Sequence, residues 1–365
     1  MHLDKIKINN FKNYNSIIFD FSPEVNFIFG KNGAGKTNLL DSIYYLSYTK
    51  SALNSTDFEN IRKGESFFKI EGTYNTNKNF YKCVLNEKFK KIIYENDTPY
   101  KKIKDHIGKI PCVFITPYDI NLIRGYSKQR RRFYDILLSQ LSKNYLNNLI
   151  DYNKLLKQRN AYLKNTLSIS EIDKDQLNTY NERLFKLNET INKTRINNIK
   201  LFESKFNKTF KILSESEITT SINYTSNFES SKGINQYDND FKIDFYSNKT
   251  SFGIHHDDYL FKMNEELIKK FGSQGQQKLF IISLKITEFF MLKETSKKTP
   301  ILLLDDVFDK LDDKRVSLLL KYFNSNDFSQ IFITDSIIDR MNKIKNINKK
   351  LKIIKIQNGT IDEKL

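Results

Sequence analysis

Tryptophan is absent from the sequence, and cysteine, proline and glycine are scarce. The two cysteines, Cys83 and Cys112, are too few for a disulfide framework, which fits a reducing compartment. No apolar run approaches membrane-spanning length, and residues 1–10 resemble neither a signal peptide nor a transit peptide. These absences argue against a secreted disulfide-rich domain and a membrane protein, and we expect a soluble, cytoplasmic chain without a membrane partner.

The chain is long and strongly basic, with 365 residues and a net charge of +17. Its length predicts two lobes, or one large domain with an insertion. Clustered Lys and Arg release counterions from nucleic acid, so the surplus charge indicates a polyanionic partner. The alternative is that part of the surplus is compositional, because the chain is also rich in Asn and Ile, as in proteins from A+T-rich genomes.

Strand patterns near both ends of the chain flank a helical middle. Short apolar runs predict a β-meander at 67–95 and strands at 25–29, 111–117, 300–306, 330–335 and 351–359. Apolar residues three and four apart predict helices at 137–156, 177–210 and 279–292, with a connection at 165–175 and a polar loop at 225–240. We therefore expect an α/β fold made of 1–125 and 250–365, with a mainly helical lobe inserted at 126–249.

The segment 30–37 (GKNGAGKT) matches the P-loop pattern, in which glycines and a Lys-Thr pair join a strand to a helix. The glycines let backbone N–H groups turn toward phosphate oxygens, Lys36 places its charge against the β- and γ-phosphates, and Thr37 offers a hydroxyl to Mg²⁺. The alternative is a chance glycine-rich turn. We expect ATP to bind Gly30, Lys31, Asn32, Gly33, Ala34, Gly35, Lys36 and Thr37.

A second source of metal ligands follows the apolar run at 301–304, which ends in Asp305 and Asp306. A buried strand presents such acids at the carboxyl edge of the sheet, where α/β folds bind ligands. We assign Asp305 to the Mg²⁺ shell through water, and Asp306 to polarising the attacking water. The alternative is that an acid at the end of a strand only caps the next turn. This interpretation is the weaker one here, because two acids lie opposite a P-loop.

The segment 271–278 (FGSQGQQK) places Ser273, Gln274, Gly275 and Gln276 just before an apolar helix. A hydroxyl and bare N–H groups at a helix start form an anion site, although serine and glycine also cap many ordinary helices. The order of P-loop, insert, this segment and the Asp305–Asp306 strand resembles the ABC-type ATPase head of SMC-like proteins. In that architecture the signature helix of one subunit closes on the nucleotide of another.

Further segments make the resemblance more specific, and the chain is similar over nearly its whole length to the RecF family. These segments are NNFKNY (9–14), FITPYDINLIRG (114–125), RRRFYD (130–135), LLKQRNAYLK (155–164), GIHHDD (253–258) and LLLDDVFDKLD (302–312). The resemblance implies a clamp for DNA repair and replication that dimerises on ATP, binds DNA at single-stranded gaps and acts as a weak, DNA-stimulated ATPase. It also implies RecO- and RecR-like partners that help load a RecA-type recombinase.

The sequence departs from the family pattern at several positions. Ile254 and His256 replace Pro and Arg, Tyr118 replaces Glu beside Asp119, and Asp335 interrupts a Thr-rich run near the γ-phosphate. No role is carried over for His256 or Asp335, while His255, Asp257 and Asp258 are either site residues or parts of a tight turn. For DNA we expect contacts from the basic cluster Arg124, Lys128, Arg130, Arg131 and Arg132, although some of these side chains can instead pair with acids of the chain.

Two other functions stay open from the sequence. Another SMC-like ATPase would share these motifs, but residues 136–250 are too few for long coiled-coil arms. A nucleotide-regulated structural DNA binder without significant turnover would also share them, but the intact Lys36, Thr37, Asp305 and Asp306 argue against it. A head fused to a nuclease is disfavoured because no block of residues remains for it.

Overall fold

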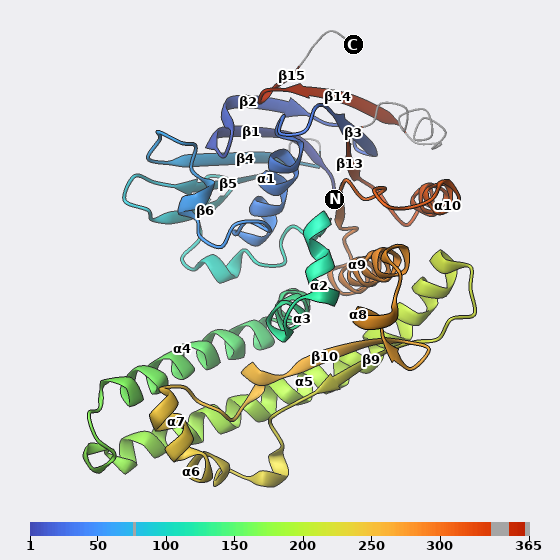
Figure 1. Ribbon diagram of the computed structural model, residues 1–365. Coiled ribbons are helices and arrows are strands. Elements are labelled where there is room, and N and C mark those ends of the chain that lie inside the picture. Colours follow the sequence, from blue (N-terminus) through green and yellow to red (C-terminus); the bar gives the residue numbers. More distant parts are fainter. Residues whose placement is uncertain (76–77, 337–349, 362–365) are drawn as a thin grey trace. The chain divides into compact units, whose positions relative to one another are not determined.

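The computed structural model describes residues 1–75, 78–336 and 350–361 (Figure 1). The chain forms two compact units, one of Met1–Ile120, Ile212–Glu215 and Gln274–Leu365, the other of Asn121–Lys211 and Ser216–Ser273. Residues 250–273 therefore lie in the second unit, whereas the sequence grouped them with the two α/β halves. The reason is strand pairing, because β10 (Asp258–Met263) pairs with β9 (Thr220–Thr225) inside the second unit.

A largely parallel sheet forms the centre of the first unit, and it contains the strands expected from the apolar runs. Its order is β15 (Thr360–Ile361), β14 (Leu351–Gln357), β3 (Val25–Phe29), β13 (Ile331–Asp335), β12 (Ile301–Asp305) and β8 (Cys112–Ile115). All pairs are parallel except the edge pair of β14 and β15. Every residue of β3, β8, β12 and β13 is buried, as expected where both faces of a parallel sheet are covered.

A second sheet of the first unit is antiparallel and contains the predicted meander. Its order is β2 (Tyr14–Asp20), β1 (Leu3–Phe11), β4 (Phe68–Tyr74), β5 (Asn79–Leu85), β6 (Lys91–Glu95) and β7 (Thr98–Pro99). In β4, buried residues alternate strictly with partly exposed ones, so only one face of this sheet enters the core.

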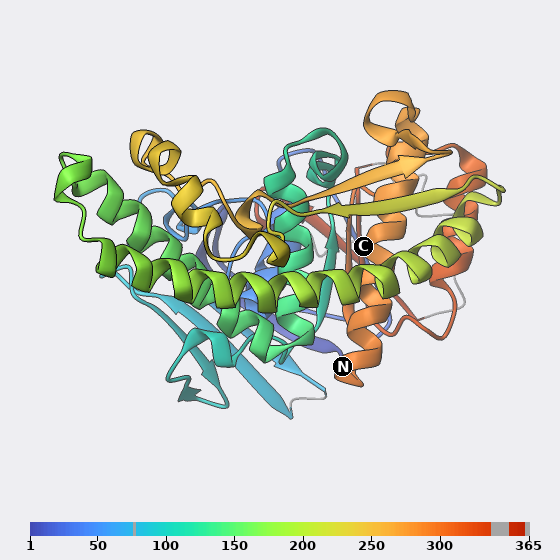
Figure 2. The same cartoon turned by 90° about the horizontal axis from the view of Figure 1, so that it is seen from below.

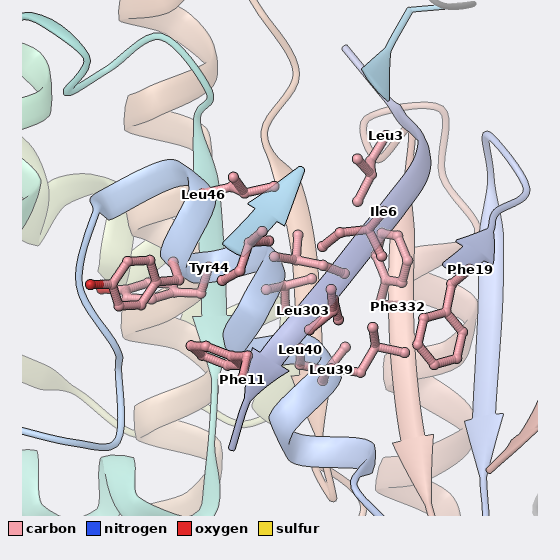
Figure 3. Packing of buried hydrophobic residues seen from close by; sticks show 14 of the residues in the cluster. Leu3, Ile6, Phe11, Phe19, Leu39, Leu40, Tyr44, Leu46, Leu303 and Phe332 are labelled. Carbon is pink, nitrogen blue, oxygen red and sulfur yellow. The ribbon is translucent and has the colours of Figure 1, made fainter. Parts of the chain in front are cut away.

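Helix α1 (Lys36–Tyr48) lies between these two sheets and contacts both, through β1, β4 and β5 on one side and β8, β12 and β13 on the other. Figure 3 shows how Leu39 and Leu40 of α1 pack between Ile6 of the antiparallel sheet and Leu303 of the parallel sheet. Each such side chain contributes about 1.5–3 kcal/mol through burial. Packing on both faces fixes the start of α1, and therefore the turn that precedes it.

One further helix of the first unit was predicted from the sequence. The apolar helix expected at 279–292 is the middle of α9 (Gln274–Ser296), which packs against β8. Among the described residues of this unit, the structure adds helices that were not predicted, α10 (Asp313–Phe323) and the short 3₁₀ turns η1 (Phe58–Asn60), η2 (Ile103–Asp105) and η3 (Pro117–Ile120).

The second unit is built on two long helices, α4 (Lys143–Asn165) and α5 (Lys174–Ser214), which are joined where the sequence analysis expected the connection. The last residues of α5, from Ile212 on, are counted with the first unit. Strand β9 runs along α5, with hydrogen bonds from Thr220 to Asn207 and from the Ile222 N–H to Glu203 (Figure 2). The rest of this unit consists of α2 (Asn121–Arg124), α3 (Ser127–Leu141), η4 (Ile169–Glu171), η5 (Ser230–Lys232), α6 (Gln236–Asn239), α7 (Phe241–Ser247), η6 (Ile254–His256), β11 (Glu266–Leu267) and α8 (Ile268–Phe271).

Two details of the helical prediction are wrong. The helix expected through 137–156 is broken at Ser142, whose extended backbone ends α3 and whose hydroxyl accepts a hydrogen bond from the Tyr145 N–H at 3.2 Å to begin α4. Ser142 thus ends one helix and caps the start of the next, and the three-and-four spacing of apolar residues continues across the break. The segment expected as a loop at 225–240 contains η5 and α6.

Within the part of the chain that the structure describes, no helix combines the length and apolar character needed to cross a membrane.

Candidate nucleotide site

The P-loop segment lies between β3 and α1, where the sequence placed it. Its outer residues Lys31, Asn32 and Gly33 are exposed, and its inner residues Ala34 and Gly35 are buried. A Cβ atom on Gly35 would lie 2.6 Å from Asn13 Nδ2, and φ at Gly35 is 116°, a value that side chains disfavour. A Cβ on Gly33 would meet no atom of the described residues within 4 Å, so this glycine borders open space in the part of the chain that the structure describes.

Gly30 begins the loop in contact with the strand beside it. A Cβ atom at this position would lie 2.2 Å from the carbonyl oxygen of Ile356 in β14. The glycine is thus required by packing against the parallel sheet, in addition to any role in binding phosphate.

Lys36 spans the loop, and its ammonium donates to the carbonyl oxygens of Gly30 at 2.7 Å and Lys31 at 3.2 Å. The side chain is buried, and the first turn of α1 has neither an acidic residue nor a side-chain cap. The first N–H groups of a helix have no partner inside it, and they carry a positive partial charge. Lys36 and the start of α1 therefore combine into a site for an anion.

Asp305 at the end of β12 faces the hydroxyl of Thr37, which lies 2.9 Å from Asp305 Oδ1 and 3.0 Å from Oδ2. Thr334 at the end of β13 donates to Oδ1 at 2.7 Å. Burial raises the pKa of the Asp305 carboxyl, while the two threonine hydroxyls and the charges of Lys36 and Lys278 oppose this rise. The carboxylate is therefore oriented from two sides at the sheet edge.

Asp306 follows directly, with φ of 44° and a backbone N–H that donates to Thr334 Oγ1 at 3.2 Å. Burial, followed by the neighbouring charge of Asp305, raises the pKa of the Asp306 carboxyl. Asp335 at the end of β13 is fully buried and also acts to raise this pKa. The acids form a negative edge that faces the positive P-loop.

These residues fit Mg²⁺ and a nucleotide phosphate. The Thr37 hydroxyl and the Asp305 carboxylate are hard oxygen ligands of the kind that Mg²⁺ selects, and Mg²⁺ usually completes its shell with water and substrate phosphates. The open side of Gly33 and the uncapped start of α1 give the phosphates a place beside these ligands.

Thr334 and Lys278 complete this edge, and the sequence analysis assigned neither of them. Thr334 holds Asp305 because β13 is the strand next to β12, a neighbourhood that the order of the strands along the chain does not reveal. Burial lowers the pKa of Lys278, and the charges of Asp119, Asp309 and Asp306 oppose that shift. Lys278 lies one turn into α9 and seven residues before Lys285, which places the two lysines on the same face of the helix. This spacing was the signal in the sequence that could have identified Lys278.

The signature segment lies at the start of α9, as expected, with Ser273 just before the first helical residue, Gln274. Ser273 and Gln274 are exposed, and Gly275 and Gln276 are partly exposed. A Cβ atom on Gly275 would lie 2.6 Å from a guanidinium nitrogen of Arg315, so the glycine leaves room for this mobile side chain.

The structure divides the basic cluster that was predicted to bind DNA. Arg130 makes a bidentate ion pair with Asp258, at 2.7 and 2.9 Å, and donates to two backbone carbonyls of the same unit. Arg131 donates to the backbone carbonyl of Asp257 at 2.5 Å. These two arginines bind inside the second unit, whereas the remaining three members of the cluster are exposed. They are Arg124, Lys128 and Arg132.

The GIHHDD segment forms a structural turn within the second unit. His255 Nδ1 lies 2.6 Å from the Tyr152 hydroxyl, and its Nε2 lies 2.8 Å from the Thr250 carbonyl. Asp257 is fully buried, and it pairs with Arg195 at 2.6 Å and accepts from the Ser226 hydroxyl at 2.6 Å. Of the two interpretations left open, these contacts support the tight turn.

Comparison with known proteins agrees with this geometry. The family model "RecF/RecN/SMC N terminal domain" matches residues 2–102. The DNA replication and repair protein RecF of Flavobacterium johnsoniae is 41% identical over 346 residues, covering 94% of this chain and 96% of that protein. RecF of Phocaeicola vulgatus is 39% identical, covering 100% of this chain and 99% of its own length.

Solved structures give the same result. The structure of the recombination mediator protein RecF with ATP, in the RecFOR pathway, has a TM-score of 0.87 and 27% identity, and the match covers 99% of this chain and 97% of that one. The Smc head domain of Pyrococcus furiosus has a TM-score of 0.55 and 14% identity over 99% of this chain and 95% of its own, which shows a shared ABC-type ATPase head fold. The chain belongs to the RecF family of DNA replication and repair proteins.

Proposed function

We propose that the chain is an ATP-dependent DNA clamp of replication and recombinational repair, with its ATPase lobe in the first unit. The observation that carries the proposal is the approach of the Thr37 hydroxyl to both oxygens of Asp305, 268 residues away in the sequence. This contact brings a P-loop and a strand-end carboxylate into one phosphate and metal site. A RecF relative that was solved with ATP supports the same ligand here.

Within one copy, each side chain has a distinct task. Lys36 and the N–H groups at the start of α1 would bind the phosphates, and Thr37 and Asp305 would hold Mg²⁺. When bound, Mg²⁺ neutralises charge on the phosphate oxygens. Asp306 orients the attacking water, and because its side chain is shorter than that of Glu, we expect slow turnover.

Between two copies, we propose that the segment Ser273–Gln276 closes over the nucleotide held by the partner's P-loop. The exposed hydroxyl of Ser273 and the start of α9 supply the donors for phosphate. ATP binding would then favour a homodimer, and hydrolysis would release it.

DNA is the proposed ligand of the dimer, at single-stranded gaps, with RecR- and RecO-like proteins as mediators. The exposed side chains of Arg124, Lys128 and Arg132 and the net charge of +17 support electrostatic binding. None of these residues implies base readout, so we expect shape and charge to decide affinity.

One experiment tests the nucleotide and dimer parts together. Molar mass by light scattering and affinity for gapped DNA are measured with and without ATP for the wild type, Lys36→Met and Ser273→Arg. ATP should produce a dimer and tighten DNA binding in the wild type only. If ATP changes neither property in the wild type, the clamp is refuted; if Ser273→Arg dimerises normally, the role of the signature between copies is refuted.

A second experiment tests the DNA surface. Lys128→Glu with Arg132→Glu should weaken DNA binding and reduce the slope of log K against log salt by about 0.9 for each phosphate that the protein no longer neutralises. Lys321→Glu, on the exposed side of α10, is the matched control. An unchanged slope in the double variant, or an equal change in the control, would contradict this surface.

A further inference from the structure

Two turns outside the P-loop hold its backbone carbonyls. The turn between β1 and β2 supplies Asn13 Nδ2, which donates to the Ala34 carbonyl at 3.3 Å, and the Tyr14 hydroxyl, which donates to the Gly35 carbonyl at 2.9 Å. The turn between β14 and β15 supplies the N–H of Gly359, which donates to the Ala34 carbonyl at 3.0 Å. These contacts give a role to the NNFKNY segment, which the nucleotide chemistry did not use.

The direction of each held carbonyl determines the direction of the next N–H. In a trans peptide the carbonyl of one residue and the N–H of the following residue point to opposite sides, and no cis peptide occurs among the described residues. The Ala34 carbonyl points toward its two donors, Asn13 and Gly359. The Gly35 N–H of the same peptide therefore points away from them. The Gly35 carbonyl accepts the Leu39 N–H of the first helical turn at 3.0 Å and, as a second donor, the Tyr14 hydroxyl. The Lys36 N–H of the same peptide therefore points the opposite way, at the uncapped start of α1.

The β1–β2 turn is itself held tightly to α1. The Lys12 ammonium pairs with Asp41 at 2.6 Å, with both side chains buried, and Asn38 donates to Asn13 Oδ1 at 2.7 Å. Tyr14 is fully buried, and burial raises the pKa of its phenol, so the hydroxyl remains a neutral donor. The donors therefore have fixed positions, as preorganisation of an anion site requires.

We propose that Tyr14, supported by Asn13, is a positioning residue that orients the Ala34–Gly35 and Gly35–Lys36 peptides so that their N–H groups face the nucleotide phosphates. The proposal rests on ATP binding at the P-loop and adds residues outside the loop that determine its affinity. Tyr14 does not touch the phosphates; it acts through the Gly35 carbonyl.

The other explanation is that Tyr14 only fills the core, where its ring lies edge-on to Phe19 at 5.9 Å. Tyr14→Phe keeps this ring and removes only the hydroxyl. Tyr74→Phe is the matched control, because Tyr74 is also fully buried in the same core and its hydroxyl has no hydrogen-bond partner among the residues that the structure describes. Thermal unfolding of both variants verifies that each is folded.

The test has one readout without nucleotide and one with it. In the full-length protein with ¹⁵N-labelled Gly and Lys, Tyr14→Phe should shift the Lys36 amide signal, because the carbonyl of the same peptide loses one of its two donors and keeps only the Leu39 N–H. Tyr74→Phe should leave that signal in place. Calorimetric titration with Mg-ATP should show binding about 3- to 10-fold weaker for Tyr14→Phe and unchanged for Tyr74→Phe, the range expected for one hydrogen bond.

The outcomes separate the inference from the proposed function. A wild-type protein that fails to bind ATP contradicts the proposed function. If the wild type binds ATP but Tyr14→Phe binds equally well, or if the Lys36 amide signal does not move, the positioning role is overturned while the function stands. Equal losses in Tyr14→Phe and Tyr74→Phe would also overturn it, because a general effect on the core would explain both.

Discussion

Removal of the Arg195 side chain of α5 should strongly disturb the second unit. Its guanidinium pairs with Asp257 at 2.6 Å and with Asp135 at 2.8 Å, and it donates to the Ile254 carbonyl at 2.9 Å. Only 2% of the side chain is exposed. Burial alone would lower the pKa of Arg195, but Asp135, Tyr145 and Asp257 raise it, so the group remains charged.

Arg195→Met keeps most of the volume and removes the charge, which leaves two carboxylates without their partner. Breaking a buried ion pair from one side costs about 3–5 kcal/mol. For a unit of about 150 residues, this free energy corresponds to a fall in melting temperature of about 6–20 °C.

The assay is urea and thermal unfolding followed by circular dichroism, with Arg183→Met as the control, since Arg183 is exposed on the same helix. Adding Asp257→Asn to Arg195→Met should restore part of the loss, because it removes one uncompensated charge. A melting temperature for Arg195→Met within about 2 °C of wild type would refute the reasoning.

Three further predictions concern other groups. Burial raises the pKa of the Cys83 and Cys112 thiols, so in the native protein both should react with a disulfide reagent only at the rate of unfolding, measured by absorbance against urea. Burial raises the pKa of Asp305, so at pH values above the ordinary pKa of Asp the charged carboxylate destabilises the folded state. Asp305→Asn should therefore raise the melting temperature at pH 7 and weaken Mg-ATP binding in calorimetry. A lower melting temperature of this variant would contradict the prediction. Burial acts to raise the pKa of Asp258, but hydrogen bonds from Arg130 and the Tyr259 N–H lower it overall. Arg130→Gln should therefore lower the free energy of unfolding at pH 7, and this loss should shrink below about pH 4 in urea titrations. A loss of stability that does not depend on pH would count against the ion pair.

The parts of the fold that the sequence predicted well are those determined by local patterns. Apolar runs identified β3, β12 and β13 because both faces of a parallel sheet are covered, and the P-loop pattern located its turn because the glycines are required by backbone geometry. Asp305 was singled out because acids at the end of a buried strand accompany a P-loop, and the structure places it within hydrogen-bond distance of Thr37; its role as a metal ligand stays a prediction.

The parts that escaped prediction depend on partners distant in sequence. Arg130 and Asp258 are 128 residues apart, so the run of arginines left open that some of them pair with acids of the chain but did not show which arginine or which acid. Thr334 reaches Asp305 only through the order of strands in the sheet. The break at Ser142 was missed for another reason, since the cap preserves the apolar spacing on both sides.

The position of β3 in its sheet has a consequence for the synthesis of the protein. Both neighbours of β3, β13 and β14, come from the last tenth of the chain, and the Gly359 N–H that holds the Ala34 carbonyl comes later still. At about 5–20 residues per second, some 300 residues and about 15–60 s separate the P-loop from the strands that complete it. A nascent chain therefore carries its phosphate-binding segment without these neighbours until residues 331–359 have been synthesised, and we expect nucleotide to bind only after that point.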